Sequence, residues 1–100
     1  MNKRRIRWDK SALIYFSEAI RYIRKDSVQN AEKVKKEILV HIKELSLRPE
    51  IYAPDKYKKD NTDYNYRAIE LHHFRIAYLV KEEEIIIARI RHTSQEPQQY

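Results

Sequence analysis

The second half of the chain contains three short runs whose apolar and polar residues follow the pattern of β-strands. They are YRAIEL at 66–71, FRIAYLV at 74–80 and EIIIARIRH at 84–92, all rich in β-branched or aromatic residues. Only His72-His73 separates the first two runs, and only Lys81-Glu82-Glu83 separates the second and third. Because such short polar gaps join antiparallel neighbours, these residues predict a three-strand antiparallel meander.

The first half of the chain has a helical period instead. RIRW at 5–8 alternates and predicts a short strand, after which apolar residues recur every three or four positions. They form one stripe that ends near residue 25 and a second that stops before Pro49: Ala12, Phe16, Ala19, Ile20 and Ile23, then Val28, Ala31, Val34, Ile38, Ile42 and Leu45. Asp9 or Ser11 is expected to cap the first helix and Asp26-Ser27 the second. The tight joint between the stripes predicts an αα-hairpin.

Together these elements predict an α+β fold: a short N-terminal strand, an αα-hairpin, and a three-strand antiparallel meander whose sheet the helices cover. A length of 100 residues suits a single domain spanning 1–100. The mean hydropathy of -0.84 argues against a membrane span. With no cysteine, and with a basic start that leads into a polar helix, we expect a cytoplasmic protein without a signal peptide.

Positive charge lies inside the predicted strands rather than at their ends. The residues are Arg67, Arg75, Arg89 and Arg91, with His92 closing the last strand. A buried unpaired guanidinium is costly, so one face of the sheet is expected to be open and cationic. The net charge of +6 favours a polyanionic partner, either nucleic acid or an acidic protein segment, although solubility alone would also account for it.

A long connection at 48–65 interleaves tyrosines with lysines: Tyr52, Tyr57 and Tyr64 with Lys56, Lys58 and Lys59. Aromatic rings that stack on bases, beside lysines that meet phosphates, would suit single-stranded RNA. Alternatively, the tyrosines attach the loop to the helices while the lysines point to water. Under the RNA hypothesis, the candidate RNA-binding residues are Lys56, Lys58, Lys59, Arg89 and Arg91.

The order of elements resembles that of the RelE/ParE superfamily, the toxins of bacterial type II toxin–antitoxin systems. The likeness covers essentially the whole chain and rests on LSLRP at the end of the second helix, YRAI, FRIAY and IIIARIRH. The resemblance implies one of two activities. RelE-like and YoeB-like toxins cut mRNA in the ribosomal A site, whereas ParE-like toxins inhibit DNA gyrase. It also implies a small acidic antitoxin that covers the hairpin or a sheet edge.

The resemblance to RelE and YoeB implies candidate catalytic residues. Arg75, within FRIAY, is similar to an arginine that stabilises the attacked phosphate, and Arg67 lies near a second basic position. His92 is similar to a histidine that acts on the leaving group. Tyr100 is the only terminal tyrosine, but in YoeB the tyrosine directly follows the histidine, where this chain has Thr93.

RNA cleavage also needs a base, and here only Glu50 or Tyr100 is available, each on position alone. An ion pair of Arg75 with Glu70 or another acid is the structural alternative to a catalytic arginine. The sequence therefore favours a ribosome-dependent mRNA endonuclease slightly, with the ribosome and mRNA as partners. The alternatives are a ParE-like inhibitor of DNA gyrase and an inactive toxin that only binds its antitoxin. No metal ligand set or cofactor motif is present, since the adjacent His72 and His73 point apart and the chain has no glycine.

Overall fold

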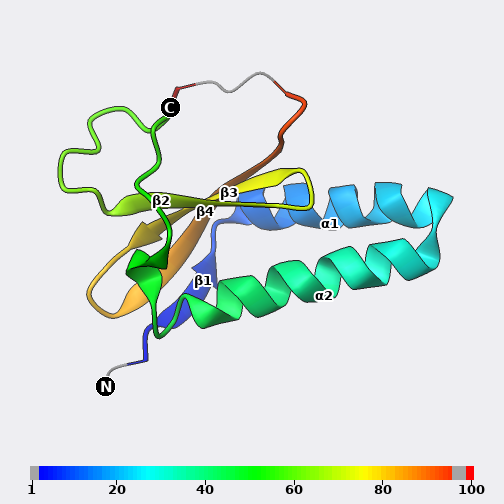
Figure 1. Cartoon of the computed structure of the whole chain (residues 1–100), viewed down its shortest axis with the longest axis horizontal. Coiled ribbons are helices and arrows are strands. Elements are labelled where there is room, and N and C mark those ends of the chain that lie inside the picture. The colour runs from blue at the N-terminus through cyan, green and yellow to red at the C-terminus, as the bar shows by residue number, and fades with distance from the viewer. Residues whose placement is uncertain (1–2, 96–98) are drawn as a thin grey trace.

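The computed structural model describes residues 3–95 and 99–100 and has the predicted α+β architecture (Figure 1). Its elements are β1 (Arg5–Trp8), α1 (Lys10–Asp26), α2 (Val28–Glu44), the short 3-10 helix η1 (Pro49–Ile51), β2 (Tyr66–Leu71), β3 (Phe74–Val80) and β4 (Glu84–His92). The strand order is β1-β4-β3-β2. The meander is antiparallel, as predicted, while β1 adds to it in parallel beside β4. The sheet is therefore mixed.

A single residue joins the two helices and serves both. The amide of Ser27 donates to the carbonyl of Ile23 at the end of α1, and its hydroxyl accepts from the amide of Asn30 at 3.0 Å. Side-chain oxygens at this position satisfy amides that a first helical turn leaves free. Ser27 thus confirms the predicted second cap, and Asp9, which accepts from the amide of Lys10, caps α1.

The core lies between the helical hairpin and one face of the sheet. The buried helix residues all belong to the predicted stripes, but Ala19 and Ile23 are only half-buried and Val28 is 59% exposed. The sheet contributes mainly Ile69, Ile76, Tyr78, Ile85, Ile87 and Ile90, each at most 2% exposed. Val28 is the first residue of α2, and Figure 1 shows that the end of the hairpin where α1 meets α2 projects beyond the sheet.

The register of β4 changes once. Val80 to Tyr78 face Ile85 to Ile87, but beyond the irregularity Ala77 faces Arg89, so Ala88 is the extra residue of a β-bulge. The bulge puts Ile87 and Ile90 on the same, buried face, although an unbroken strand would point them to opposite faces. The residues after it, Arg89 and Arg91, consequently lie on the face away from the helices.

The β2–β3 turn consists of His72 and His73, and both have positive φ, at 52° and 67°. Asn and Gly are the usual residues of such two-residue turns, because bulkier side chains are strained there. Both imidazoles have partners: His72 pairs with Glu37 of α2, and His73 stacks on His92 with centroids 6.1 Å apart. The first contact holds the turn against the hairpin and the second holds it against the end of β4.

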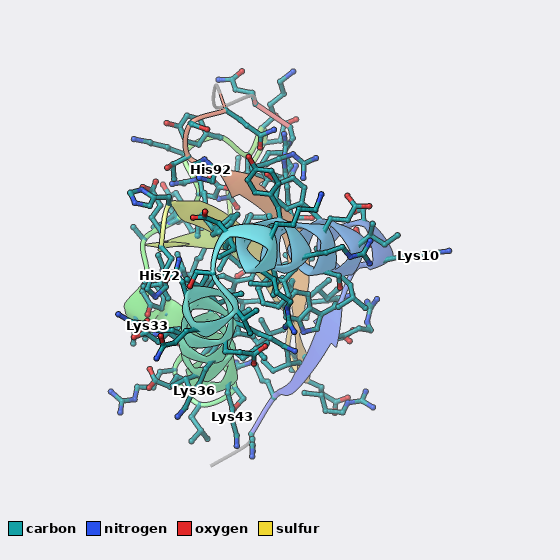
Figure 2. The ribbon with its side chains drawn as sticks, turned by 90° about the vertical axis from the view of Figure 1, so that its right-hand side faces the viewer. Lys10, Lys33, Lys36, Lys43, His72 and His92 are labelled. Atoms are coloured by element: carbon teal, nitrogen blue, oxygen red, sulfur yellow. The ribbon has the colours of Figure 1, made fainter. Side chains whose placement is uncertain are left out.

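The outer side of α2 is basic. Lys33, Lys36 and Lys43 are exposed and point away from α1, whereas Lys10 lies at the opposite side of the hairpin (Figure 2). Leu39 and Val40, at 39% and 47% exposure, lie on the same helix. Neither α1 nor α2 is apolar enough over its length to cross a membrane, and the described part of the chain has no other helix that could.

Candidate functional site

Three arginines share the face of the sheet that the helices leave open. Arg75 of β3 lies directly opposite Arg91 of β4, and Arg89 lies opposite Ala77. They line a pocket of about 480 Å³ together with residues of the loop before β2 and of the segment after β4. The expectation of an open, cationic sheet face is thus confirmed.

Of the other two predicted catalytic side chains of the strands, Arg67 lies on the opposite face and His92 borders the pocket. Arg67 is paired with Tyr78, which points into the core, so Arg67 is on the opposite face from Arg75. Its Nη1 donates to the carbonyl of Tyr52 at 2.7 Å, which ties the loop to the sheet. The expectation that Arg67 joins Arg75 on the open face is wrong. Glu70 is the residue of β2 that pairs with Arg75, and it lies three positions after Arg67. Side chains an odd number of positions apart along a strand point to opposite faces.

His92 lies at the end of β4, in register with the buried Phe74. Its ring contacts Phe74 edge to face, and its Nδ1 accepts a hydrogen bond from the amide of Ser94 at 3.1 Å. An amide can only donate, so the proton of the neutral ring is on Nε2. His92 borders the pocket from the end of the strand, whereas the three arginines lie on its open face.

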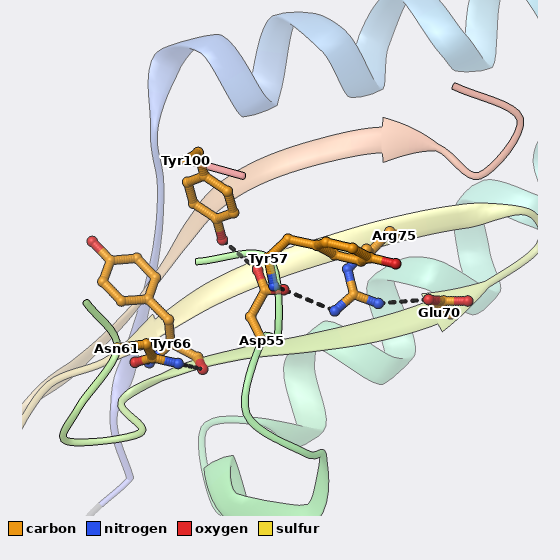
Figure 3. A network of polar contacts seen from close by, with 7 residues as sticks. All are labelled: Asp55, Tyr57, Asn61, Tyr66, Glu70, Arg75 and Tyr100. Atoms are coloured by element: carbon orange, nitrogen blue, oxygen red, sulfur yellow. Dashed lines mark hydrogen bonds and ion pairs between the residues drawn. The ribbon is translucent and has the colours of Figure 1, made fainter. Parts of the chain in front are cut away.

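Arg75 is held by two carboxylates, as Figure 3 shows. Its Nη2 is 2.8 Å from Oδ1 of Asp55 and its Nη1 is 2.5 Å from Oε2 of Glu70. The ring of Tyr57 covers the guanidinium with its centroid 4.7 Å away. Burial lowers the pKa of Arg75, but the hydrogen bonds and charges of the two acids outweigh it and leave the pKa raised. The structural alternative for Arg75, an ion pair with Glu70 or another acid, is therefore confirmed.

Asp55 is the centre of this network, because its carboxylate is only 1% exposed and accepts three hydrogen bonds. Besides Arg75, the amide of Tyr57 donates to it at 3.1 Å and the hydroxyl of Tyr100 at 2.5 Å. Burial raises the pKa of Asp55, but the bonds from Tyr100, Arg75 and the amide together lower it below its ordinary value. The carboxylate is consequently held in its charged form.

Tyr100 lies back over the sheet and docks against the loop. Its amide donates to the carbonyl of Tyr57 at 3.0 Å, and its main-chain oxygen accepts from the amide of Lys59 at 2.7 Å. Its ring packs edge to face on Tyr66 and covers the guanidinium of Arg89. Burial and the hydrogen bond to Asp55 raise the pKa of its hydroxyl. A hydroxyl held in this way donates firmly to Asp55 and is a poor base.

Of the loop lysines, Lys56 lines the pocket together with the three arginines, whereas Lys58 and Lys59 do not. The Nζ of Lys58 lies over the rings of Tyr66 and Tyr100, at 4.8 and 5.3 Å from their centroids. Lys56 lies over the ring of Tyr57, and Lys59 is exposed. Tyr57 and the half-buried Tyr52 attach the loop to the fold, whereas Tyr64 is 60% exposed.

Two side chains that the sequence did not single out organise the site. Asp55 stands between a proline and a lysine in the loop, where a lone aspartate indicates only a turn. Tyr15 of α1 lies beside its helical stripe, yet its hydroxyl accepts from the amide of His92 at 2.9 Å and its ring covers Arg91. Both act through contacts distant in sequence, so no local signal identifies them.

The network predicts a loss of stability in acid. Since the pKa of Asp55 is lowered by folding, its contribution is complete above the ordinary aspartate value near 3.8 and disappears as the pH falls through the lowered value. Urea unfolding at pH 6 and again between pH 2 and 3 measures this loss. Asp55→Asn, which cannot titrate, should lose less stability over the same interval than the natural chain does. An equal loss in both would contradict the lowered pKa.

Known proteins resemble this chain both in sequence and in fold. Residues 6–97 match the family described as the ParE toxin of the type II toxin–antitoxin system, parDE. The chain belongs to the ParE toxin family. A solved structure titled as the chromosomal ParDE TA system from P. aeruginosa is similar to this ParE-family chain, with a TM-score of 0.69 and 21% identity. The match covers 90% of this chain and 96% of the other, and at this identity it shows a shared fold.

A search of curated proteins gave no match. Membership in the ParE family places the chain in the RelE/ParE superfamily, as the resemblance implied. The chain is therefore a toxin of the type II toxin–antitoxin class. Among the described residues of this ParE-family chain, no three histidine, aspartate or glutamate side chains gather as a metal site would require.

Proposed function

We propose that this ParE-family toxin acts by binding DNA gyrase and does not cleave RNA. The observation that carries the proposal is the double ion pair of Arg75, whose charge is already neutralised by Asp55 and Glu70. A cation that stabilises a phosphorane must direct its free donors at the position where charge develops. In this chain both terminal nitrogens of Arg75 already have carboxylate partners.

His92 and Tyr100 border the same pocket as Arg75, but the groups that a nuclease needs are not free to act on one phosphate there. Arg67 is on the other face, His92 is at the strand end, and the hydroxyl of Tyr100 donates to a carboxylate. Cleavage by a 2′-hydroxyl needs base, cations and acid within hydrogen-bond reach of one phosphate. This geometry favours the binding alternative over the mRNA endonuclease and its ribosomal partner, which the sequence favoured slightly.

The helical hairpin is the surface we propose for the contact with gyrase. It projects beyond the sheet, and the outer side of α2 combines the exposed Lys33, Lys36 and Lys43 with the exposed Leu39 and Val40. Protein interfaces often combine such an apolar centre with a charged rim that accelerates association. We place the toxin in the cytoplasm with gyrase.

The family and the similar ParDE structure support an antitoxin as second partner. The net charge of +6 favours an acidic one, since complementary charge speeds encounter and neutralises self-repulsion. An acidic peptide encoded beside this chain is the expected antitoxin.

The deciding experiment compares two activities of the purified toxin. We expect it to inhibit the supercoiling of relaxed plasmid by gyrase and to leave mRNA on programmed ribosomes intact. The triple variant Lys33→Gln, Lys36→Gln, Lys43→Gln should need at least about tenfold more protein for half inhibition, the equivalent of ~1.4 kcal/mol. Its matched control is Lys10→Gln, Lys59→Gln, Lys81→Gln, which removes the same charge elsewhere. Undiminished supercoiling with excess toxin, or cleaved mRNA, would overturn the proposal.

A further inference from the structure

The open sheet face carries more positive charge than its own acids neutralise. The pocket there is lined by Lys56, Arg75, Arg89 and Arg91 but by two carboxylates, those of Asp55 and Glu70. Both acids pair with Arg75, and no described carboxylate lies within 4.0 Å of the guanidinium of Arg89 or Arg91. Arg89 and Arg91 lie two residues apart on the same face of β4, so their positive charges repel each other. A bound anion would relieve this repulsion.

Aromatic rings hold in place the two arginines that have no carboxylate partner among the described residues. Tyr100 covers Arg89 with its centroid 4.6 Å from Cζ, and Tyr15 covers Arg91 at 5.2 Å. The hydroxyl of Tyr15 is fixed by the amide of His92 and by Gln95, to which it donates at 2.7 Å. Stacking on a ring fixes the plane of a guanidinium and leaves its edge open to a planar acceptor. Nη1 of Arg91 donates to the carbonyl of Ile90 at 2.6 Å, and the described residues give the other edge donors of the two arginines no partner. Carboxylates are such acceptors and bind arginine with two parallel hydrogen bonds.

The shape of the pocket favours a peptide over a nucleic acid. Its volume of about 480 Å³ suits one or two side chains rather than a strand of nucleotides. A nucleobase needs a free aromatic face on which to stack. Arg75 already lies over the ring of Tyr57, and Arg89 lies over the ring of Tyr100. A carboxylate side chain needs only the guanidinium edges.

We propose that this pocket is a binding site for an acidic segment of a partner protein, with carboxylates of closely spaced Asp or Glu residues on Arg89 and Arg91. The proposal rests on the proposed function only for the source of the segment, the acidic antitoxin. It places that contact on the sheet face opposite the hairpin, so the pocket and the proposed gyrase surface are separate.

The test follows the side-chain Nε–H signals of Arg89 and Arg91 by NMR during titration with a blocked hexaglutamate peptide. The matched probe is the blocked hexaglutamine peptide, and a single-stranded oligonucleotide tests the alternative class. We expect saturable shifts of both signals with hexaglutamate and none with hexaglutamine. The double variant Arg89→Gln, Arg91→Gln should bind hexaglutamate at least about tenfold more weakly, whereas Lys33→Gln, Lys36→Gln, with the same charge change on α2, should bind unchanged.

A dispersed amide spectrum establishes that the double variant is folded, and Arg89→Lys, Arg91→Lys, which keeps the charge but not the paired donors, should bind with intermediate affinity. Unchanged binding by the glutamine variant would overturn the proposal, and so would an oligonucleotide that binds the same two signals more tightly than hexaglutamate. Neither result depends on gyrase, so a failure here and a failure of the supercoiling assay are distinguishable.

Discussion

Arg75→Ala is expected to lower the free energy of unfolding by about 3 to 5 kcal/mol, the range observed when one partner of a buried ion pair is removed. The substitution leaves Asp55, whose carboxylate is 1% exposed, without its cation, and it removes the stacking partner of Tyr57. Urea denaturation monitored by circular dichroism measures the loss. Arg21→Ala, an exposed arginine of α1, is the control and should change the free energy by no more than about 0.5 kcal/mol.

The same variant separates a structural role of Arg75 from a catalytic one. If Arg75 only stabilises the fold, Arg75→Ala should fail to arrest growth at 37 °C, but protein that is folded at low temperature should inhibit gyrase as the natural toxin does. A catalytic arginine would behave in the opposite way, because activity would be lost while the unfolding curve stayed near that of the natural chain. That outcome would contradict the structural role argued from the two ion pairs.

Asp55→Asn is expected to lower the free energy of unfolding by about 2 to 4 kcal/mol. The amide group retains one acceptor oxygen, while Arg75, Tyr100 and the amide of Tyr57 all donate to this position. Arg75 keeps its ion pair with Glu70 in this variant, so the expected loss is smaller than that for Arg75→Ala.

Asp60→Asn, in the same loop, is the matched control for Asp55→Asn. It removes the same charge from an exposed residue with φ of 56°, a conformation that asparagine tolerates, and should leave stability within about 0.5 kcal/mol. A double-mutant cycle with Asp55→Asn, Arg75→Ala and the variant that carries both changes then measures the coupling free energy between the two side chains. Additive losses would show that Asp55 and Arg75 do not act as a pair.

The elements of the fold could be predicted because each carries its own local pattern. The stripe of α2 from Ala31 to Ile42 is buried as its spacing predicts, and Ile85 and Ile87 belong to an inner strand. Such periodic patterns report which side of an element is buried. They do not report where β1 attaches, and its parallel pairing with β4 comes from tertiary packing.

The side chains that share a face of the sheet could be predicted from the sequence only where the pairing register of the strands could be inferred. The two-residue turn of His72 and His73 pairs Glu70 with Arg75, and two-step alternation then separates Arg67 from Arg75. The bulge at Ala88 has no comparable sequence signal in a chain without glycine, yet it decides which residues of β4 accompany Arg89. Asp55 comes to Arg75 from a loop, and loops are placed by side-chain contacts that no period encodes.

The paired carboxylates around Arg75 also constrain how this sequence can diverge. A variant that gained a phosphate-stabilising arginine at this position would have to lose both Asp55 and Glu70, and the first of these losses disconnects Tyr100 as well. Each intermediate on that path is less stable than its predecessor before it gains any new chemistry. In a ParE-family chain with this network, a change at Asp55 is therefore constrained by stability, independently of the target on which the toxin acts.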